Sequence, residues 1–357
     1  MKHIHQSCIL IFLFLLTSTN LYTKNTVIAT IAVGINPMGI ATAPHNHHVY
    51  VANNNNSGIT NQNSVDVICN IENNTLETIY DNSFNQPYKI AISPNGKRAY
   101  VTNNNSTTVS VIKTKHNNVI DVINGFDGPS GIVITPNNKF AYVANYGSAG
   151  GVGSGNGTTV NMVDLKTNTI IGEPIIVGLA PIALAISRDG EFVYVINYAN
   201  GTPASGSMSV IKTKNNTVTE TITGFFGPAD IAVTPNGKYA YITNFGSNSL
   251  TPNGTTVSVV KLHNHLKIVD TIELGIQPSG IAVTPNGHFV YVTNYNTLSS
   301  GAGQGTVNII NTHTNKVIFP TIMVGESPKA IAISRHGKRA YVTNYTSNSV
   351  SVIELKD

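Results

Sequence analysis

The chain has 357 residues, of which 41% are hydrophobic and none is tryptophan. Its 31 glycines and 16 prolines, with Val, Ile and Ala carrying most of the hydrophobicity, are typical of short strands joined by many turns. The formal net charge is only +4, and Cys69 is the one cysteine beyond the first 24 residues, which excludes an intrachain disulfide from the mature protein.

The first 24 residues differ in composition from the remainder. Lys2 precedes the apolar run Ile9–Leu16, and small polar residues follow at Thr17–Asn20. Because such a run is too short to span a bilayer, residues 1–24 are predicted to be a secretory signal peptide. We therefore expect an exported protein that is periplasmic, on the cell surface or secreted, with no membrane span after cleavage.

The remainder, residues 25–357, is organised by an internal repeat. A proline is followed 13 residues later by a tyrosine that opens a Tyr-Val/Ile-x-Asn string. The seven pairs are Pro37/Tyr50, Pro87/Tyr100, Pro129/Tyr142, Pro181/Tyr194, Pro228/Tyr241, Pro278/Tyr291 and Pro328/Tyr341. Successive tyrosines are 42 to 52 residues apart, so each repeat has a constant half and a variable half. A repeat over nearly the whole chain predicts one closed array.

Each repeat can be divided into four short strands, here called A to D. In the fifth repeat, strands are predicted at 231–234, 239–243, 257–260 and 268–272, with the turn Pro235-Asn236-Gly237 between the first two. Four short strands with a period of roughly 48 residues are typical of propeller blades. The predicted fold is an all-β, seven-bladed β-propeller of four-stranded antiparallel blades.

The two ends of the repeat region predict how the ring closes. The last repeat stops at strand C, residues 350–353, whereas residues 25–31 match a strand D with no A, B or C before it. We expect the N-terminal strand to complete the last blade, because this closure leaves no open edge between the chain ends.

These strings resemble the YVTN-repeat β-propeller family over residues 25–357. The resemblance is carried by Tyr291-Val292-Thr293-Asn294-Tyr295 and by Ile281-Ala282-Val283-Thr284-Pro285-Asn286-Gly287. It implies a seven-bladed propeller in an exported or cell-surface protein of bacteria or archaea. It implies little about activity, because propellers host many functions.

The variable half of each repeat is the loop from strand B to strand C, and all seven such loops lie on one face of the predicted disc. They contain no charged residue, and each begins with the repeat asparagine. Amides followed by aromatic rings suit a neutral ligand such as a glycan, and the candidate ligand-binding residues are Asn145, Tyr146, Asn197, Tyr198, Asn244, Phe245, Asn294, Tyr295, Asn344 and Tyr345. The alternative is that each asparagine ends its strand by bonding the loop backbone and that the aromatics cover blade junctions.

The opposite face carries the A-to-B and C-to-D turns and is basic. Beyond residue 24, every Lys and Arg except Lys89 and Lys329 falls in these turns or the strand ends beside them. This pattern suggests contact with an anionic polymer, and the candidate residues are Lys97, Arg98, Lys113, Lys115, Lys212, Lys214, Lys261, Lys338 and Arg339. The alternative is that they are solvated turn residues that keep the protein soluble.

Evidence for catalysis or a cofactor is sparse. His45, His47 and His48 on one turn are candidate ligands of a divalent metal, but no carboxylate or cysteine accompanies them, and an incidental turn is favoured. Four carboxylates near the predicted channel, Asp81, Asp127, Asp230 and Glu326, are expected to be solvated. We find no haem, zinc or Ser/His/Asp motif, so no catalytic residue, metal or cofactor is predicted.

The favoured interpretation is a non-enzymatic binding or structural module of the bacterial cell envelope. Its expected partner is an envelope component, glycan or protein, contacted through the uncharged loop face by a monomeric propeller. The alternatives are a binder of nucleic acid or another anionic polymer through the basic face, and a lactonase-like hydrolase or redox-partner propeller.

Overall fold

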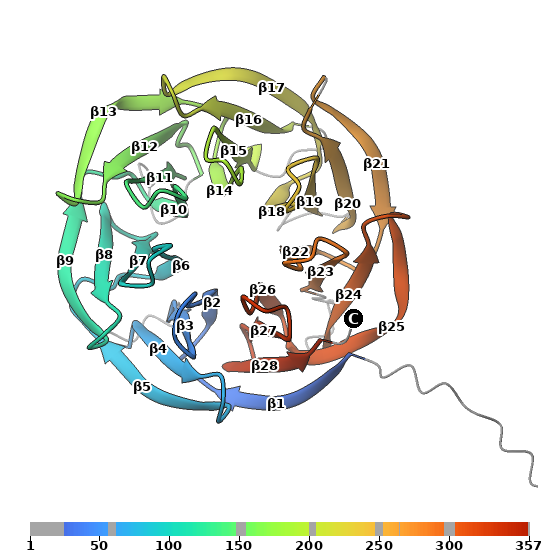
Figure 1. Cartoon of the computed structure of the whole chain (residues 1–357), viewed down its shortest axis with the longest axis horizontal. Helices are drawn as coiled ribbons and strands as arrows, with labels where there is room; N and C mark the ends of the chain where they lie inside the picture. The colour runs from blue at the N-terminus through green and yellow to red at the C-terminus, as the bar shows by residue number, and fades with distance from the viewer. Residues whose placement is uncertain are drawn as a thin grey trace, which may run out of the picture.

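The computed structural model describes residues 25–55, 62–147, 155–199, 205–246, 253–263, 265–295 and 304–355. Within these ranges, seven sheets of four antiparallel strands stand around a central axis, and no α-helix is present (Figure 1). None of the described segments therefore forms an apolar helix long enough to span a membrane. The predicted signal peptide lies outside the described residues.

The four strands of each sheet follow one another from the axis to the rim. The innermost strands (A) are β2 (Pro37–Thr42), β6 (Pro87–Ile92), β10 (Pro129–Ile134), β14 (Pro181–Ile186), β18 (Pro228–Val233), β22 (Pro278–Val283) and β26 (Pro328–Ile333). The second strands (B) are β3 (His48–Asn53), β7 (Arg98–Asn103), β11 (Phe140–Asn145), β15 (Phe192–Asn197), β19 (Tyr239–Gly246), β23 (Phe289–Asn294) and β27 (Arg339–Asn344).

The third strands (C) are β4 (Ser64–Cys69), β8 (Thr108–Lys113), β12 (Thr159–Asp164), β16 (Gly206–Lys212), β20 (Asn253–Lys261), β24 (Gln304–Asn311) and β28 (Ser349–Glu354). The outer strands (D) are β5 (Asn74–Tyr80), β9 (Asn118–Asn124), β13 (Thr169–Ile176), β17 (Thr217–Phe225), β21 (Lys267–Glu273), β25 (Lys316–Glu326) and, in the last sheet, β1 (Thr26–Ala32).

The predicted propeller and its closure are confirmed. β1 pairs with β28 in antiparallel register from Thr26 opposite Glu354 to Ala32 opposite Ser349, so the first strand of the chain completes the last sheet. Strand bounds differ from prediction in the fifth sheet, where strand A begins at Pro228, three residues before the predicted start, and strand C begins at Asn253, four residues before it. The repeat proline is therefore the first residue of the strand, a position at which its missing N–H costs no ladder bond.

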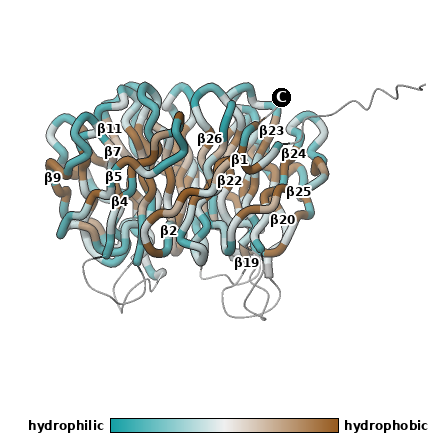
Figure 2. The backbone as a smooth tube through the Cα atoms, turned by 90° about the horizontal axis from the view of Figure 1, so that it is seen from below, coloured by the Kyte–Doolittle hydropathy of each residue, from teal (hydrophilic) through white to brown (hydrophobic). Residues whose placement is uncertain are grey.

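Burial explains why strands B and C lack a simple alternation of polar and apolar residues. β7 has five buried residues in succession after Arg98, whereas the outer strand β9 is mostly exposed. Each sheet is covered on both sides by its neighbours, and seven hydrophobic clusters occupy the seven junctions. In the edge-on view the apolar segments lie in the middle of the disc, and polar turns lie on its two faces (Figure 2).

The repeat tyrosines join neighbouring sheets. The Tyr50 and Tyr241 hydroxyls donate to the side-chain oxygens of Asn117 and Asn315, 2.7 and 2.8 Å away, in the next C-to-D turn. In the last sheet, Arg339 Nη1 donates to the equivalent Asn73 Oδ1 at 3.1 Å, and within the described residues the buried Tyr341 hydroxyl has no partner. The junctions thus use either tyrosine or arginine to reach the next turn.

This difference predicts that a tyrosine-to-phenylalanine substitution changes the stability differently at the two equivalent positions Tyr241 and Tyr341. Tyr241→Phe should lower the free energy of unfolding by about 1 kcal/mol, because the Asn315 oxygen loses its donor. Tyr341→Phe should be neutral or slightly stabilising, because it removes a buried hydroxyl that has no partner. Urea unfolding of both variants measures the contrast, and equal losses would contradict the assignment.

Candidate functional site

The chain enters every innermost strand through the same backbone geometry. The residue before each repeat proline is left-handed, with φ between 49° and 55°, and these residues are Asn36, Gln86, Gly128, Ala180, Gly227, Gln277 and Ser327. Its carbonyl accepts, at 2.9 to 3.1 Å, the N–H of the residue that follows the repeat asparagine. Five of the seven are not glycine, and such strain is concentrated at functional sites in proteins.

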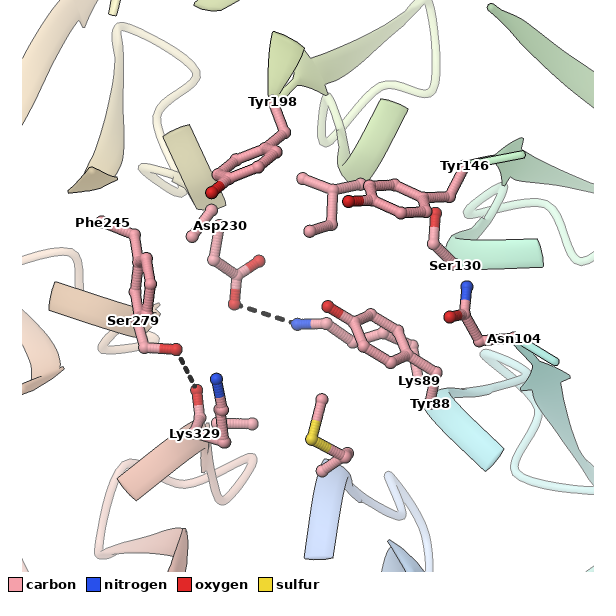
Figure 3. A pocket seen from close by; sticks show the side chains of 14 residues that line it. Tyr88, Lys89, Asn104, Ser130, Tyr146, Tyr198, Asp230, Phe245, Ser279 and Lys329 are labelled. Carbon is pink, nitrogen blue, oxygen red and sulfur yellow. Dashed lines mark hydrogen bonds and ion pairs between the residues drawn. The ribbon is translucent and has the colours of Figure 1, made fainter. Parts of the chain in front are cut away.

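Because this backbone geometry is the same in every blade, side chains from two equivalent positions of each blade are arranged around the central axis. We call the position after the repeat proline the inner position, and the position after the repeat asparagine the rim position. They enclose a pocket of about 260 Å³ at the mouth of the central channel (Figure 3). Its lining residues are Met38, Tyr88, Lys89, Asn104, Ser130, Tyr146, Ile182, Tyr198, Ala229, Asp230, Phe245, Ser279, Lys329 and Ala330.

The pocket includes the inner residue of all seven blades, which differ in chemistry although the scaffold repeats. In the second and fifth sheets the following residue also reaches the pocket with a charged side chain, Lys89 or Asp230. In the first sheet that place is taken by Gly39, where an added Cβ would lie 2.4 Å from the carbonyl oxygen of Tyr88. Close approach of the innermost strands therefore restricts where a side chain can enter the channel.

An ion pair crosses the channel. Lys89 Nζ, from β6, lies 3.0 Å from Asp230 Oδ2, from β18, and the two side chains are 27% and 17% exposed. The backbone N–H of each residue is held at 3.0 Å by a repeat threonine, Thr102 for Lys89 and Thr243 for Asp230. The pair therefore connects the second and fifth sheets across the axis, as Figure 3 shows.

Tyrosine rings form much of the wall. Tyr88, Tyr146 and Tyr198 all line the pocket, and the Tyr198 hydroxyl donates to the carbonyl of Gly246 at 3.2 Å. Burial, followed by the nearby Tyr146, Asp230 and Tyr198, raises the pKa of Tyr88 above its ordinary value. The phenol of Tyr88 is thus neutral at physiological pH and can donate a hydrogen bond to a bound molecule.

Lys329 carries a second ammonium group into the pocket. Its Nζ lies 3.9 Å from the ring centroid of Tyr295, 5.1 Å from that of Phe245 and 5.9 Å from that of Tyr345. Burial lowers the pKa of Lys329 to about 8. The three rings stabilise the cation through their negative faces but supply no counter-charge.

The structure divides the predicted ligand-binding set into two groups. Asn145, Asn197, Asn244, Asn294 and Asn344 are buried, and each side-chain amide donates two bonds of 2.5 to 3.0 Å to side-chain oxygens of its own strand C. The aromatic members all surround the pocket: Tyr146, Tyr198 and Phe245 line it, and Tyr295 and Tyr345 enclose Lys329. Ligand binding by these aromatics stays a prediction.

The sequence does not single out the inner position as part of a binding site. The seven residues after the repeat prolines can nevertheless be identified directly from the repeat register. Asp230 was expected to be solvated, and this was wrong, because it is paired with Lys89. Of the four carboxylates considered for channel chemistry, Asp230 is the one that lines this pocket.

On the turn face, the candidate polyanion-binding residues differ in how far they are exposed to solvent. Lys97, Lys113, Lys115, Lys212, Lys214 and Lys338 are exposed, and Lys261 is partly buried. Arg98 and Arg339 instead reach the next sheet, where Arg98 Nη1 donates to the Leu165 carbonyl at 2.8 Å and Arg339 to Asn73. Polyanion binding by the exposed lysines stays a prediction.

The histidine turn gives no metal-like geometry. His45 uses both ring nitrogens, with Nε2 3.0 Å from the Pro94 carbonyl and Nδ1 3.0 Å from Arg335 Nη1. Burial, and secondarily His47, lowers the pKa of His48. Within the described residues, no three His, Cys, Asp or Glu side chains are grouped so that they could hold a metal ion.

The cross-channel pair predicts a measurable coupling. Lys89→Met or Asp230→Leu alone should lower the free energy of unfolding by about 1–3 kcal/mol, less than for a fully buried pair, because both groups retain some solvent. The double variant should recover part of this loss, because neither charge is left alone. A double-mutant cycle by urea unfolding checks this, and strictly additive losses would show that the pair is not coupled.

Comparison with known proteins places the chain among propellers. A sequence model of the family described as Lactonase, 7-bladed beta-propeller matches residues 199–301 and 252–357, a region that begins just after strand B of the fourth sheet. No curated protein matches the sequence. Among solved structures, the chain is similar to a Kuenenia stuttgartiensis hydrazine synthase structure, with 22% identity, a TM-score of 0.76, and coverage of 90% of this chain and 96% of that one. At this identity the likeness shows a shared fold.

Proposed function

We propose that the protein is a non-enzymatic ligand-binding module of the bacterial cell envelope, and that its ligand occupies the pocket at the channel mouth. The observation that carries the proposal is the convergence of five rim-position aromatics around that pocket and its ammonium group. Pockets that bind small molecules combine apolar and aromatic walls with a few oriented polar groups, and this pocket has both. Its residues are also held on rigid strands by backbone bonds that repeat in every blade.

Within propellers, we propose membership of the YVTN-repeat family, because each part of its string has a role in this chain. The tyrosine reaches the next turn, the threonine holds the innermost strand, and the asparagine bonds strand C. Export follows from the predicted signal peptide at residues 1–24. Sequencing the N-terminus of the protein recovered from the periplasm or medium tests export, and an intact Met1 in the cytoplasm would contradict it.

A ligand screen of the mature protein, residues 25–357, tests the binding proposal. Neutral glycans, small organic acids and polyanions should be compared at low and high salt by calorimetry and by thermal shift. A channel ligand should lose affinity when Tyr146→Leu or Tyr198→Leu alters the wall. Tyr80→Leu is the matched control, because Tyr80 is 68% exposed on the outer strand β5. Binding that ignores both wall variants, or binding only of polyanions through turn lysines, would overturn the proposal.

A lactonase-like hydrolase is the second candidate, and the family match over residues 199–301 and 252–357 favours it. The matched part contains Asp230 and Lys329, and a lysine whose pKa is lowered to about 8 can act as a base near neutral pH. Hydrolysis of simple lactones, with and without added divalent metal, tests this candidate. Activity that survives both Asp230→Asn and Lys329→Gln would place the reaction elsewhere.

A further inference from the structure

Lys329 is the least compensated charge of the pocket. Across the described ranges one ion pair is present, between Lys89 and Asp230, so no carboxylate lies within ion-pair distance of the Lys329 ammonium. Glu326 precedes it on the same segment, and its backbone N–H binds the Ser347 hydroxyl. The groups that face Lys329 are instead the rings of Phe245, Tyr295 and Tyr345.

The charged groups of the pocket therefore sum to about one positive charge near pH 7. Lys89 and Asp230 cancel, Lys329 remains, and burial raises the pKa of Tyr88, Tyr146 and Tyr295, which keeps those phenols neutral. A partly buried cation without a counter-ion is costly, and an anion beside it would remove much of that cost. A monoanion matches this charge, whereas a dianion would leave one negative charge uncompensated.

The walls restrict the remainder of such a ligand. Met38 and Ile182 add apolar surface to the tyrosine rings, and the volume of about 260 Å³ lies just below the roughly 300 Å³ at which ligand pockets usually begin, so the ligand must be small. Flat apolar groups pack well against tyrosine faces. Ser130 and Ser279 contribute little specificity, because their hydroxyls already donate to the carbonyls of Pro181 and Lys329.

We infer that the channel pocket binds a small organic monoanion, with its carboxylate on the Lys329 ammonium and a flat apolar body against the aromatic rings that line the pocket, among which the Phe245 ring centroid lies 5.1 Å from that ammonium. This rests on the proposed function and names the ligand class of that same pocket. It differs from the expectation of a neutral glycan, because the structure places an uncompensated ammonium among the aromatics.

Benzoate is a suitable probe, with benzamide as the neutral isostere and phenyl phosphate as the dianion. Calorimetry at pH 7 with the mature protein should show that benzoate binds at least tenfold more tightly than either of the other two. Lys329→Gln should weaken benzoate binding at least tenfold. Lys97→Gln, which removes an exposed turn lysine, should leave binding unchanged.

The pH profile of the unaltered protein gives an independent readout if the Lys329 variant folds poorly. Because the folded-state pKa of Lys329 is lowered to about 8, the free protein loses this charge as the pH rises through 8. Benzoate affinity should be flat around pH 6 to 7 and then fall toward tenfold per pH unit above 8. Proton uptake should accompany binding between pH 8 and 9, since the anion stabilises the protonated amine.

The failures of the two proposals can be told apart. Equal affinity for benzoate and benzamide, or a pH-independent affinity, would overturn the anion assignment. If a neutral glycan bound in a way that depends on Tyr146, ligand binding at the channel would stand and only the ligand class would fail. If no compound bound in a way that depends on Tyr146 or Tyr198, both proposals would fall.

Discussion

Removal of residues 25–33 should abolish the stable propeller. These residues contain β1, whose Ile31 is 5% exposed and packs in the cluster between the last and first sheets. Without β1 the last sheet has three strands, and β28 presents an open edge along its whole length. The lost ladder bonds and apolar burial together amount to about 5 kcal/mol or more, a large part of the stability of a typical domain. Thermal unfolding and size-exclusion chromatography should show loss of the cooperative transition and association of chains.

Relocating the strand provides the control. Thr26 lies opposite Glu354 in the register, so residues 25–33 attached after Asp357 through a short turn would form the hairpin that the other six sheets already have between strands C and D. This variant should recover most of the lost melting temperature, although it begins near Pro37. A relocated chain as unstable as the deletion would show that β1 acts through its connection to β2 and not through closure.

The fold could be predicted from the repeat register because the same local determinants of structure recur in every blade. The repeat proline, the turn such as Pro235-Asn236-Gly237 and the buried tyrosine each determine structure within one or two neighbouring sheets. The closing strand was also predictable, since residues 25–31 carry the pattern of a strand D at the wrong end of the chain. Strand ends were less certain, as the earlier start at Pro228 shows.

The candidate site was only partly predictable, because it depends on contacts across the axis. The aromatic residues after the repeat asparagines were visible in the sequence, and they do surround one pocket. However, Lys89 and Asp230 are 141 residues apart, and periodicity alone does not say which inner residues face each other across a closed ring. The hydrogen bonds of the repeat asparagine were not predicted for a related reason, since its two acceptors lie on strand C, beyond a loop of variable length.

Asp66→Ala should cause a large loss of stability, because it removes a buried carboxylate that accepts three hydrogen bonds. Asp66 is 1% exposed, and its carboxylate accepts bonds from the Gly34 N–H at 2.7 Å, from Asn53 Nδ2 at 2.9 Å and from the Thr78 hydroxyl at 2.6 Å. Alanine leaves three donors in or near the interior without this acceptor, and bonds to an ionised group are stronger than neutral ones. The expected loss is about 3–5 kcal/mol by urea unfolding.

The sister sheets supply the matched control for Asp66. Serine stands at this place in four of them, as Ser110, Ser209, Ser258 and Ser351, and in each it accepts the bond from the repeat asparagine. Asp66→Ser should therefore keep the Asn53 bond and lose only about 1–2 kcal/mol, mainly through the Gly34 and Thr78 donors. If alanine and serine cost the same, the stabilising element would be the charge of Asp66 and not its position as an acceptor, which would set this blade apart from the other six.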